Sequence, residues 1–514
     1  MNSKLIIARG IKLDKNYTNV LSYDTNDMLS LVESHEEYSE NNYNYIDYTK
    51  NEIMANVDYT VAMSCNYIAF QNPRHGNKWY FAFIDDVKYK ATNQCLIIFT
   101  IDVWSTFFDN WSSRPCFVVR EHVNDDTIGA HTVPENVTTG DYIIIDEGVS
   151  FDDEFLNPRV VMSANIDEVG DPVLARVYNG VPSGFGYFKY DLGDASQQED
   201  FREHINLIQT RNGNLNQLFI APNWLLPGGY AGGEIQQSQT PKRTYKVVPS
   251  INSFKYEKNG NIETFTPVNK KLLTYPYCFY KFTNLQGQNG IIKQELWDNS
   301  TETLDGATYS GKIVELMGVL TAGCSIRLFP HNYNEGGIES GINSAKFPQL
   351  NWATDPYINW LTQQGVNQMT DVVSGYMSGN PVEGVLKTND LLSSSYQAYM
   401  TSPQAQGNLN AGDVMYARGF LNMGIYPWGL KKEYAEQIDD YFSRYGYKVN
   451  EVKLPNIYGR QNFNFIEIGK DDCIGYGSLP SKYMEEINDI CRQGVTIWHN
   501  HENLGNYNIN NPII

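Results

Sequence analysis

A histidine pair near the end of the chain has the spacing of a weak metal-binding pattern. His499 and His501 are separated by one residue, and Glu502 follows directly. Such a pair can ligate a transition metal when a carboxylate or a third histidine joins it. Because the pair follows a predicted strand at 495–498 in a polar tail, we interpret it as a surface pair and predict no metal site.

Other patterns with possible chemistry are weaker. The run 152–154 (Asp-Asp-Glu) lacks the spaced ligands of a calcium loop. Gly184-x-Gly186 and the glycine-rich segment 228–233 do not connect a strand to a helix, as phosphate binding requires. The nucleophile-elbow, zincin and Walker patterns are absent from the sequence. We predict no catalytic residues, no cofactor and no enzyme activity.

One charged cluster lies inside an apolar run. In a strand, Arg120 and His122 would share one face and Glu121 would lie on the other. We interpret this cluster as a structural or interface polar group. Sequence spacing says nothing about paired carboxylates for glycoside cleavage. A cell-wall-degrading enzyme is therefore kept as an alternative to a role without catalysis.

The elements that must position these residues are mainly strands. Residues 80–87 are typical of a strand with one buried face, and residues 96–101 of a strand covered on both sides. Turn-forming residues at 72–77 and 91–94 separate the runs. We predict an antiparallel meander of three or four strands, followed by a short helix at 102–111.

The first 66 residues read as strands and polar loops, with an acidic hinge at 33–44. Near the other end, helices are predicted at 431–445 and 480–492, where apolar residues recur at helical spacing and a glycine follows. Strands are predicted between and after these helices, which gives an alternating αβ part.

Four strings in and after the meander resemble the tail knob protein, or distal tail tube protein, of small picovirus-type short-tailed bacteriophages (podoviruses). Their order and spacing match as well as their composition. The similarity returns at 273–278 (LTYPYC) and from 430 to the end, and is weakest at about 150–270 and 300–425. The four strings are YIAFQN (67–72), GNKWYFAF (76–83), FTIDVW (99–104) and FVVREHV (117–123).

The resemblance implies a structural virion protein at the tail tip, assembled in the host cytoplasm. It would be a homohexameric tube that joins the upstream tail tube (lower collar) protein and lets phage DNA pass without sequence-specific binding during ejection. The implied fold is mainly β (α+β), with several antiparallel β domains forming one segment of a ring-shaped tube. A receptor-binding tail protein that recognises cell-wall carbohydrate is the alternative.

In some members of this family an apolar loop plugs the lumen and enters the host membrane on ejection. The corresponding stretch here, about 360–414, is interrupted by polar residues, so a single copy could not span a bilayer by hydropathy. A lumen plug is therefore better supported than membrane entry, and a helical insertion on the tube exterior has equal weight. The candidate residues are Trp360, Leu361, Val366, Met369, Val372, Val373, Tyr376, Met377, Val385, Leu386, Leu391, Leu392 and Met400.

Pattern and composition divide the chain into five parts. Residues 1–125 are predicted to form an N-terminal β tube domain and 126–270 a loop-rich β domain. Residues 271–345 form a β domain that returns to the tube, 346–428 the helical, Gly/Ser/Gln-rich insertion, and 429–514 the C-terminal αβ part.

The amino-acid composition favours some classes of function over others. Charged residues are 19% of the 514, against roughly 25% in an average globular protein. The 36 tyrosines suit half-buried strand faces and subunit interfaces. The net charge of −20 without a basic stripe argues against gripping nucleic acid, although an acidic wall would let DNA slide past. Simple solubility is the plainer explanation of the charge.

Cysteines and apolar runs indicate a protein made in the cytoplasm. The seven cysteines have no C-x-x-C spacing and lie mostly in apolar runs, which predicts reduced, buried thiols. We expect no secretory signal, because the N-terminal apolar run is too short. No apolar run approaches the ~18 residues of a spanning helix.

Overall fold

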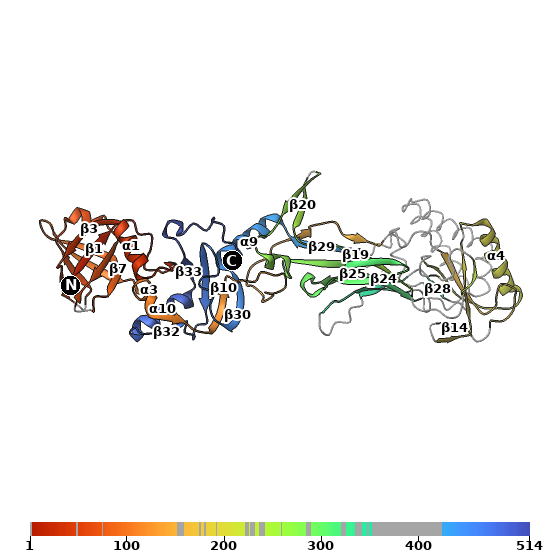
Figure 1. Cartoon of the computed structure of the whole chain (residues 1–514). Coiled ribbons are helices and arrows are strands. Elements are labelled where there is room, and N and C mark those ends of the chain that lie inside the picture. The colour runs from red at the N-terminus through yellow and green to blue at the C-terminus, as the bar shows by residue number, and fades with distance from the viewer. Residues whose placement is uncertain are drawn as a thin grey trace, which may run out of the picture. The chain divides into compact units, whose positions relative to one another are not determined.

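The computed structural model describes residues 3–47, 50–73, 76–151, 159–173, 176–178, 181–191, 193–221, 226, 232–235, 242–258, 260–283, 289–319, 325–334, 342–346, 349–351 and 424–514. The chain folds into two compact units. The first contains residues 1–140, 267–272 and 432–514, and the second contains residues 141–266 and 273–431. Both termini belong to the first unit (Figure 1).

The N-terminal part of the first unit is a seven-stranded antiparallel sheet. Its order is β3 (Glu36–Asn41), β1 (Lys4–Ala8), β6 (Tyr67–Gln71), β7 (Trp79–Ala91), β8 (Gln94–Ile101), β5 (Glu52–Ala55) and β4 (Asn44–Asp47). Strands β6, β7 and β8 are sequential neighbours, which confirms the predicted meander. Asn77 and Asn93 take positive φ angles of 57° and 54° in its turns, a conformation that asparagine tolerates.

Both faces of this sheet are covered. Along β1, Leu5 and Ile7 belong to one buried cluster and Ile6 and Ala8 to another, as the alternation of strand side chains requires. The second cluster includes Trp498, so the end of the chain packs on the N-terminal sheet. A strand between two apolar layers can be apolar on both faces.

Three short helices accompany the sheet: α1 (Thr25–Ser34), α2 (Tyr59–Met63) and α3 (Val103–Phe107). The third confirms the helix predicted after the meander, with Asp102 as its N-cap. The first two are missing from the prediction for residues 1–66. The predicted acidic hinge is also wrong, because residues 36–41 form strand β3. Asp24 caps α1 by accepting from Asn26 N and Asp27 N, a local signal stronger than the weak apolar periodicity.

A five-stranded sheet forms the rest of the first unit, in the order β2 (Asn19–Leu21), β33 (Val495–Trp498), β31 (Phe463–Ile468), β10 (Cys116–Glu121) and β30 (Tyr447–Lys453). Helices α9 (Lys432–Tyr445) and α10 (Ser481–Gln493) pack against β31. These helices and strands confirm the elements predicted after residue 430. A small pair joins β9 (Trp111–Ser113) to β32 (Gly475–Gly477).

The second unit is built from further antiparallel sheets. One contains β11 (Tyr142–Ile144), β29 (Gly424–Leu430), β22 (Cys278–Thr283) and β23 (Asn289–Ile292), with β12 (Val149–Ser150) beside β29. Another contains β18 (Gly233–Glu234), β16 (Gly186–Tyr190), β13 (Arg159–Ala164), β17 (Leu215–Ala221) and β28 (Gln349–Asn351), with helix α4 (Ala195–Thr210) against β16. A third contains β19 (Lys242–Val248), β25 (Ala307–Val319), β26 (Ser325–Pro330) and β27 (Ile342–Lys346), with β24 (Ser300–Leu304) paired to β25.

Two hairpins complete this unit: β14 (Arg176–Tyr178) with β15 (Val181–Ser183), and β20 (Phe254–Lys258) with β21 (Asn261–Phe265). The turn at Asp305-Gly306 joins β24 to β25, with φ angles of 50° and 82° that a two-residue hairpin turn needs. The fold is mainly β, as predicted. The six cysteines in the described ranges are unpaired, and all except Cys473 are buried.

Gly446 provides a test of the joint between α9 and β30. Its φ is +64°, and an added Cβ would overlap the backbone of Glu121 in β10. We expect Gly446→Ala to lower the free energy of unfolding by roughly 3 kcal/mol, measured by urea denaturation. The control is Gly505→Ala, with φ +79° and open space around the Cβ, which should cost about 1 kcal/mol. Equal losses would contradict the close approach.

Candidate functional site

The predicted plug lies outside the described residues. Every candidate from Trp360 to Met400 falls within 352–423. Strands β28 and β29, both in the second unit, flank this segment. Among the helices that the structure describes, none is long and apolar enough to cross a bilayer.

The two histidines of the predicted pair have separate environments. His499 Nδ1 lies 2.8 Å from Ser22 Oγ, and His499 Nε2 lies 3.2 Å from Asn464 Oδ1. His501 is only 3% exposed, so the prediction of a surface pair is wrong for this residue. Asn500, between the two histidines, caps a 3-10 turn at His501–Asn503 by accepting from Glu502 N.

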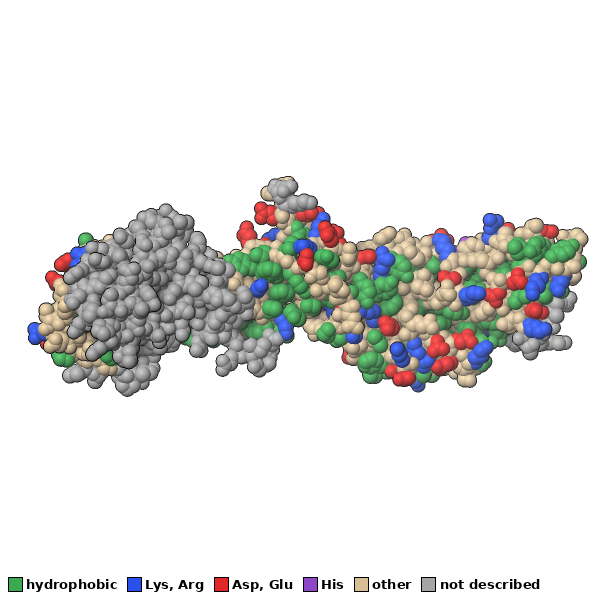
Figure 2. Space-filling model, turned by 180° about the vertical axis from the view of Figure 1, so that it is seen from behind, with side chains coloured by type: hydrophobic (Ala, Val, Ile, Leu, Met, Phe, Trp, Pro, Cys, Tyr) green, Lys and Arg blue, Asp and Glu red, His purple; other side chains and the backbone are tan. Residues whose placement is uncertain are grey.

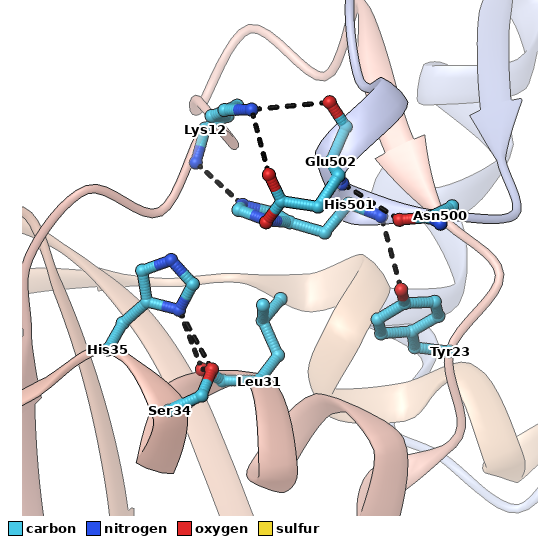
Figure 3. A network of polar contacts seen from close by, with 8 residues as sticks. All are labelled: Lys12, Tyr23, Leu31, Ser34, His35, Asn500, His501 and Glu502. Carbon is cyan, nitrogen blue, oxygen red and sulfur yellow. Dashed lines mark hydrogen bonds and ion pairs between the residues drawn. The ribbon is translucent and has the colours of Figure 1, made fainter.

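His501 instead contacts residues of the N-terminal sheet domain (Figure 3). Its ring and that of His35 have centroids 5.2 Å apart and planes at 74°. Lys12 N donates to His501 Nε2 at 3.2 Å, and His501 N donates to the hydroxyl of Tyr23 at 3.1 Å. His501 Nδ1 lies 3.4 Å from Glu502 Oε1. These contacts attach the last residues of the chain to its first residues.

The two rings and Glu502 form a compact histidine–carboxylate cluster. Each of His35, His501 and Glu502 offers one possible ligand atom, and these three atoms lie within 4.8 Å of one another. Within the described ranges this is the one group of three or more such residues that could hold a metal ion. Burial lowers the pKa of His501, and the hydrogen bond that its ring makes to the Glu502 carboxylate opposes this shift. Sequence reasoning missed His35 because it stands at the end of α1, and no local pattern links it to the C-terminal turn.

A second cluster is built around the carboxylate of Glu135, whose side chain is fully buried. Lys271 Nζ lies 2.6 Å from Glu135 Oε1, and Arg120 Nη2 donates to Glu135 Oε2. Lys448 N also donates to Glu135 Oε1 at 2.8 Å. Burial lowers the pKa of Lys271, although its pairing with Glu135 opposes this shift. We call Arg120, Glu135 and Lys271 the buried charge cluster.

The Arg120-Glu121-His122 group is buried inside the first unit. Arg120 Nη1 donates to Gly446 O at 2.7 Å, and Asn456 N donates to Glu121 Oε2 at 2.8 Å. His122 Nδ1 accepts from Phe465 N at 2.8 Å, and its Nε2 lies 3.1 Å from Ser443 O. The three side chains therefore connect β10 to the C-terminal elements. This arrangement is a structural one and offers no reactive group to solvent.

His122 should make folding stability depend on pH. Burial, with smaller effects of Arg460 and Arg120, lowers the pKa of His122 from 6.5 to about 3. The unfolded chain then binds one more proton below about pH 6.5, so stability should fall by about 1.4 kcal/mol per pH unit as pH decreases toward 3.

His122→Gln can preserve both hydrogen bonds without the titration, and it should flatten this slope in urea denaturation measured at several pH values. The control is the wild-type protein in the same pH series, which should show the full slope. An unchanged slope in His122→Gln would show that this histidine is not held neutral.

Comparisons with known proteins agree with this architecture. The family model described as the C-terminal domain of tail knob protein gp9 of Bacillus phage phi29 matches residues 240–399 and 389–512, and a model for the N-terminus of caudoviral major tail proteins matches residues 1–112. Tail knob protein gp9 of Bacillus phage PZA is 23% identical, with 90% of each chain covered, and that of phage phi29 is 23% identical with 88% covered. The solved tail knob protein gp12 of bacteriophage C1 shares the fold, with a TM-score of 0.60, 12% identity and 100% of both chains covered. The chain therefore belongs to the family of phage tail knob proteins.

Proposed function

We propose that this chain forms the distal tail tube of a short-tailed phage as a homohexamer and conducts DNA out of the virion. The observation that carries the proposal is the family match over residues 240–512 together with a shared fold along the whole chain. As a tail knob protein the chain is a structural component of the virion tail. The ring, the lumen and the passage of DNA are the proposed part.

Charge supports a conduit in preference to a nucleic-acid-binding surface. With a net charge of −20, the chain would repel phosphates from a lumen wall and keep DNA from adhering. The proposed partners are DNA in transit, the lower collar protein of the upstream tail tube and, on ejection, the host membrane. None of these contacts requires a cofactor.

Exposed apolar side chains support self-association. Hydrophobic side chains reach the surface in several groups on the face shown in Figure 2. In the first unit, β30 is the edge strand of its sheet, and Val452 on it is 68% exposed. Leu454 and Tyr458, just after this strand, are 56% and 60% exposed. Edge strands with apolar side chains favour pairing with another chain, and we assign one subunit contact to this edge.

The stretch of about 360–414 is the proposed plug. Its interrupted apolar pattern suits a loop that fills a lumen through several copies better than a helix that spans a bilayer alone. Strands β28 and β29 enter and leave this segment from the second unit, so its removal leaves the first unit's sheets complete.

Assembly is the first test. Negative-stain electron microscopy and light-scattering mass of the purified full-length protein should show six-fold rings or short tubes. Val452→Glu combined with Leu454→Glu should reduce the ring fraction at least tenfold, because charges at the β30 edge oppose pairing. The control is Ile262→Glu, a residue 67% exposed on β21 in the second unit, which should assemble normally. A monomeric wild-type protein at all concentrations would contradict self-assembly and favour receptor binding.

Deletion of residues 363–406, replaced by a short Gly/Ser linker, tests the plug. The deleted protein should assemble as the full-length protein does, and should lose central density in averaged images of the rings. DNA release from virions carrying it should be altered. If the deletion abolished folding, the segment would not be a separable plug.

A further inference from the structure

The histidine–carboxylate cluster joins two parts of the first unit that are far apart in the sequence. His35 follows α1, whereas His501 and Glu502 belong to the C-terminal 3-10 turn. We propose that His35, His501 and Glu502 bind a divalent transition cation such as Zn²⁺, which clips the C-terminal segment to the N-terminal sheet domain. This inference does not depend on the tube function.

The hydrogen bonds of His35 prepare one ring nitrogen for a cation. His35 Nδ1 lies 3.0 Å from Leu31 O, and a carbonyl can only accept, so Nδ1 carries the proton. The lone pair is then on Nε2, at the ring edge that points toward His501 in Figure 3. A metal-binding histidine commonly has its other nitrogen bonded to a backbone carbonyl in this way, which sets its tautomer and orientation.

His501 also presents its Nε2 lone pair. Because Lys12 N donates to Nε2 at 3.2 Å, the proton of the neutral ring is on Nδ1, 3.4 Å from Glu502 Oε1. A cation at Nε2 would replace one long backbone hydrogen bond with a metal–nitrogen bond. Neither ring would lose a proton, whereas the Glu502 carboxylate would leave Nδ1–H to bind the cation.

The spacing requires a modest contraction. With metal–ligand bonds of about 2.0–2.2 Å, tetrahedral ligand atoms lie roughly 3.4 Å apart. The present atoms lie within 4.8 Å of one another. The Glu502 side chain is 73% exposed and can move to shorten its distances to the two rings, whereas the rings themselves have to approach each other. Because Glu502 is exposed, a water molecule can take the fourth coordination position of the cation.

The ligand chemistry selects the class of cation. Two imidazoles and one carboxylate suit Zn²⁺ and neighbouring transition ions, whereas Ca²⁺ and Mg²⁺ need an oxygen-rich shell. The positive charge of Lys12 would repel a bound cation, because its Nζ lies 3.7 Å from Glu502 Oε2. Its side chain is 46% exposed and can move away from the cation. Removing this charge should therefore strengthen binding.

Such a clip would act on the ends of the chain. A crosslink between residue 35 and residues 501–502 closes a loop of most of the sequence, and long loops gain most from closure in chain-entropy terms. Metal that binds the folded state alone also stabilises it by RT ln(1 + L/Kd), where L is the free metal concentration, so the unfolding temperature rises with the logarithm of the metal excess. The cation would hold the terminal turn in place without a disulfide.

The test uses the full-length protein after chelator treatment and dialysis. Titration with ZnCl₂ should give one bound ion per chain by calorimetry and elemental analysis, and Co²⁺ should give the visible bands of a four-coordinate ion. His35→Ala and Glu502→Gln should each weaken Zn²⁺ binding at least tenfold, and Lys12→Gln should tighten it several-fold. Because Glu502 is exposed, Glu502→Gln keeps the test valid if His35→Ala is unstable.

His499→Ala is the matched control, since it removes the sequence neighbour and leaves the proposed ligands. It should bind Zn²⁺ as the wild type does. The absence of binding to the wild type at 100-fold excess, or equal binding by wild type and Glu502→Gln, would overturn the proposal. Loss of binding in His499→Ala together with full binding in Glu502→Gln would assign the ion to another site and overturn it as well.

Discussion

The first unit depends on the buried charge cluster. The chain enters this unit three times, as residues 1–140, 267–272 and 432–514, and the Glu135 carboxylate contacts a residue from each passage: Arg120, Lys271 and the backbone of Lys448. Removing one partner of a buried ion pair leaves an uncompensated charge, at a cost of roughly 3–5 kcal/mol. Asp439 acts similarly on the short middle passage by accepting from Val268 N and Asn269 N. These directional polar contacts connect all three passages.

Apolar burial covers both faces of the N-terminal sheet in the same unit. The N-terminal sheet has a cluster on each face, and Phe463 and Trp498 from the C-terminal part complete one of them. Such closure holds strands β1 and β33 in one apolar cluster, which opposes fraying of these two strands. The histidine–carboxylate cluster lies at this same closure, where a cation would add to contacts that already exist.

Much of the fold could be predicted where local signals agreed. The meander of β6, β7 and β8 and helices α9 and α10 had apolar periodicity, turn residues and caps that indicated the same structure. The sequence does not indicate helix α1, because its apolar pattern is weak and the capping residue Asp24 is a single local signal. A polar tail predicts an exposed His501, whereas its ring is buried and contacts His35 and the Lys12 amide.

By itself, the sequence determined the family, the mainly β class and most elements of the last 85 residues, because these depend on short strings and local periodicity. Only the tertiary structure decided which distant residues meet. Glu135 with Lys271, His122 with Phe465 and His35 with His501 are pairings between segments whose local patterns carry no information about each other. The physical reason is that strand order and burial arise from packing of the whole chain, and the chemistry of a polar group follows from the partners that this packing supplies.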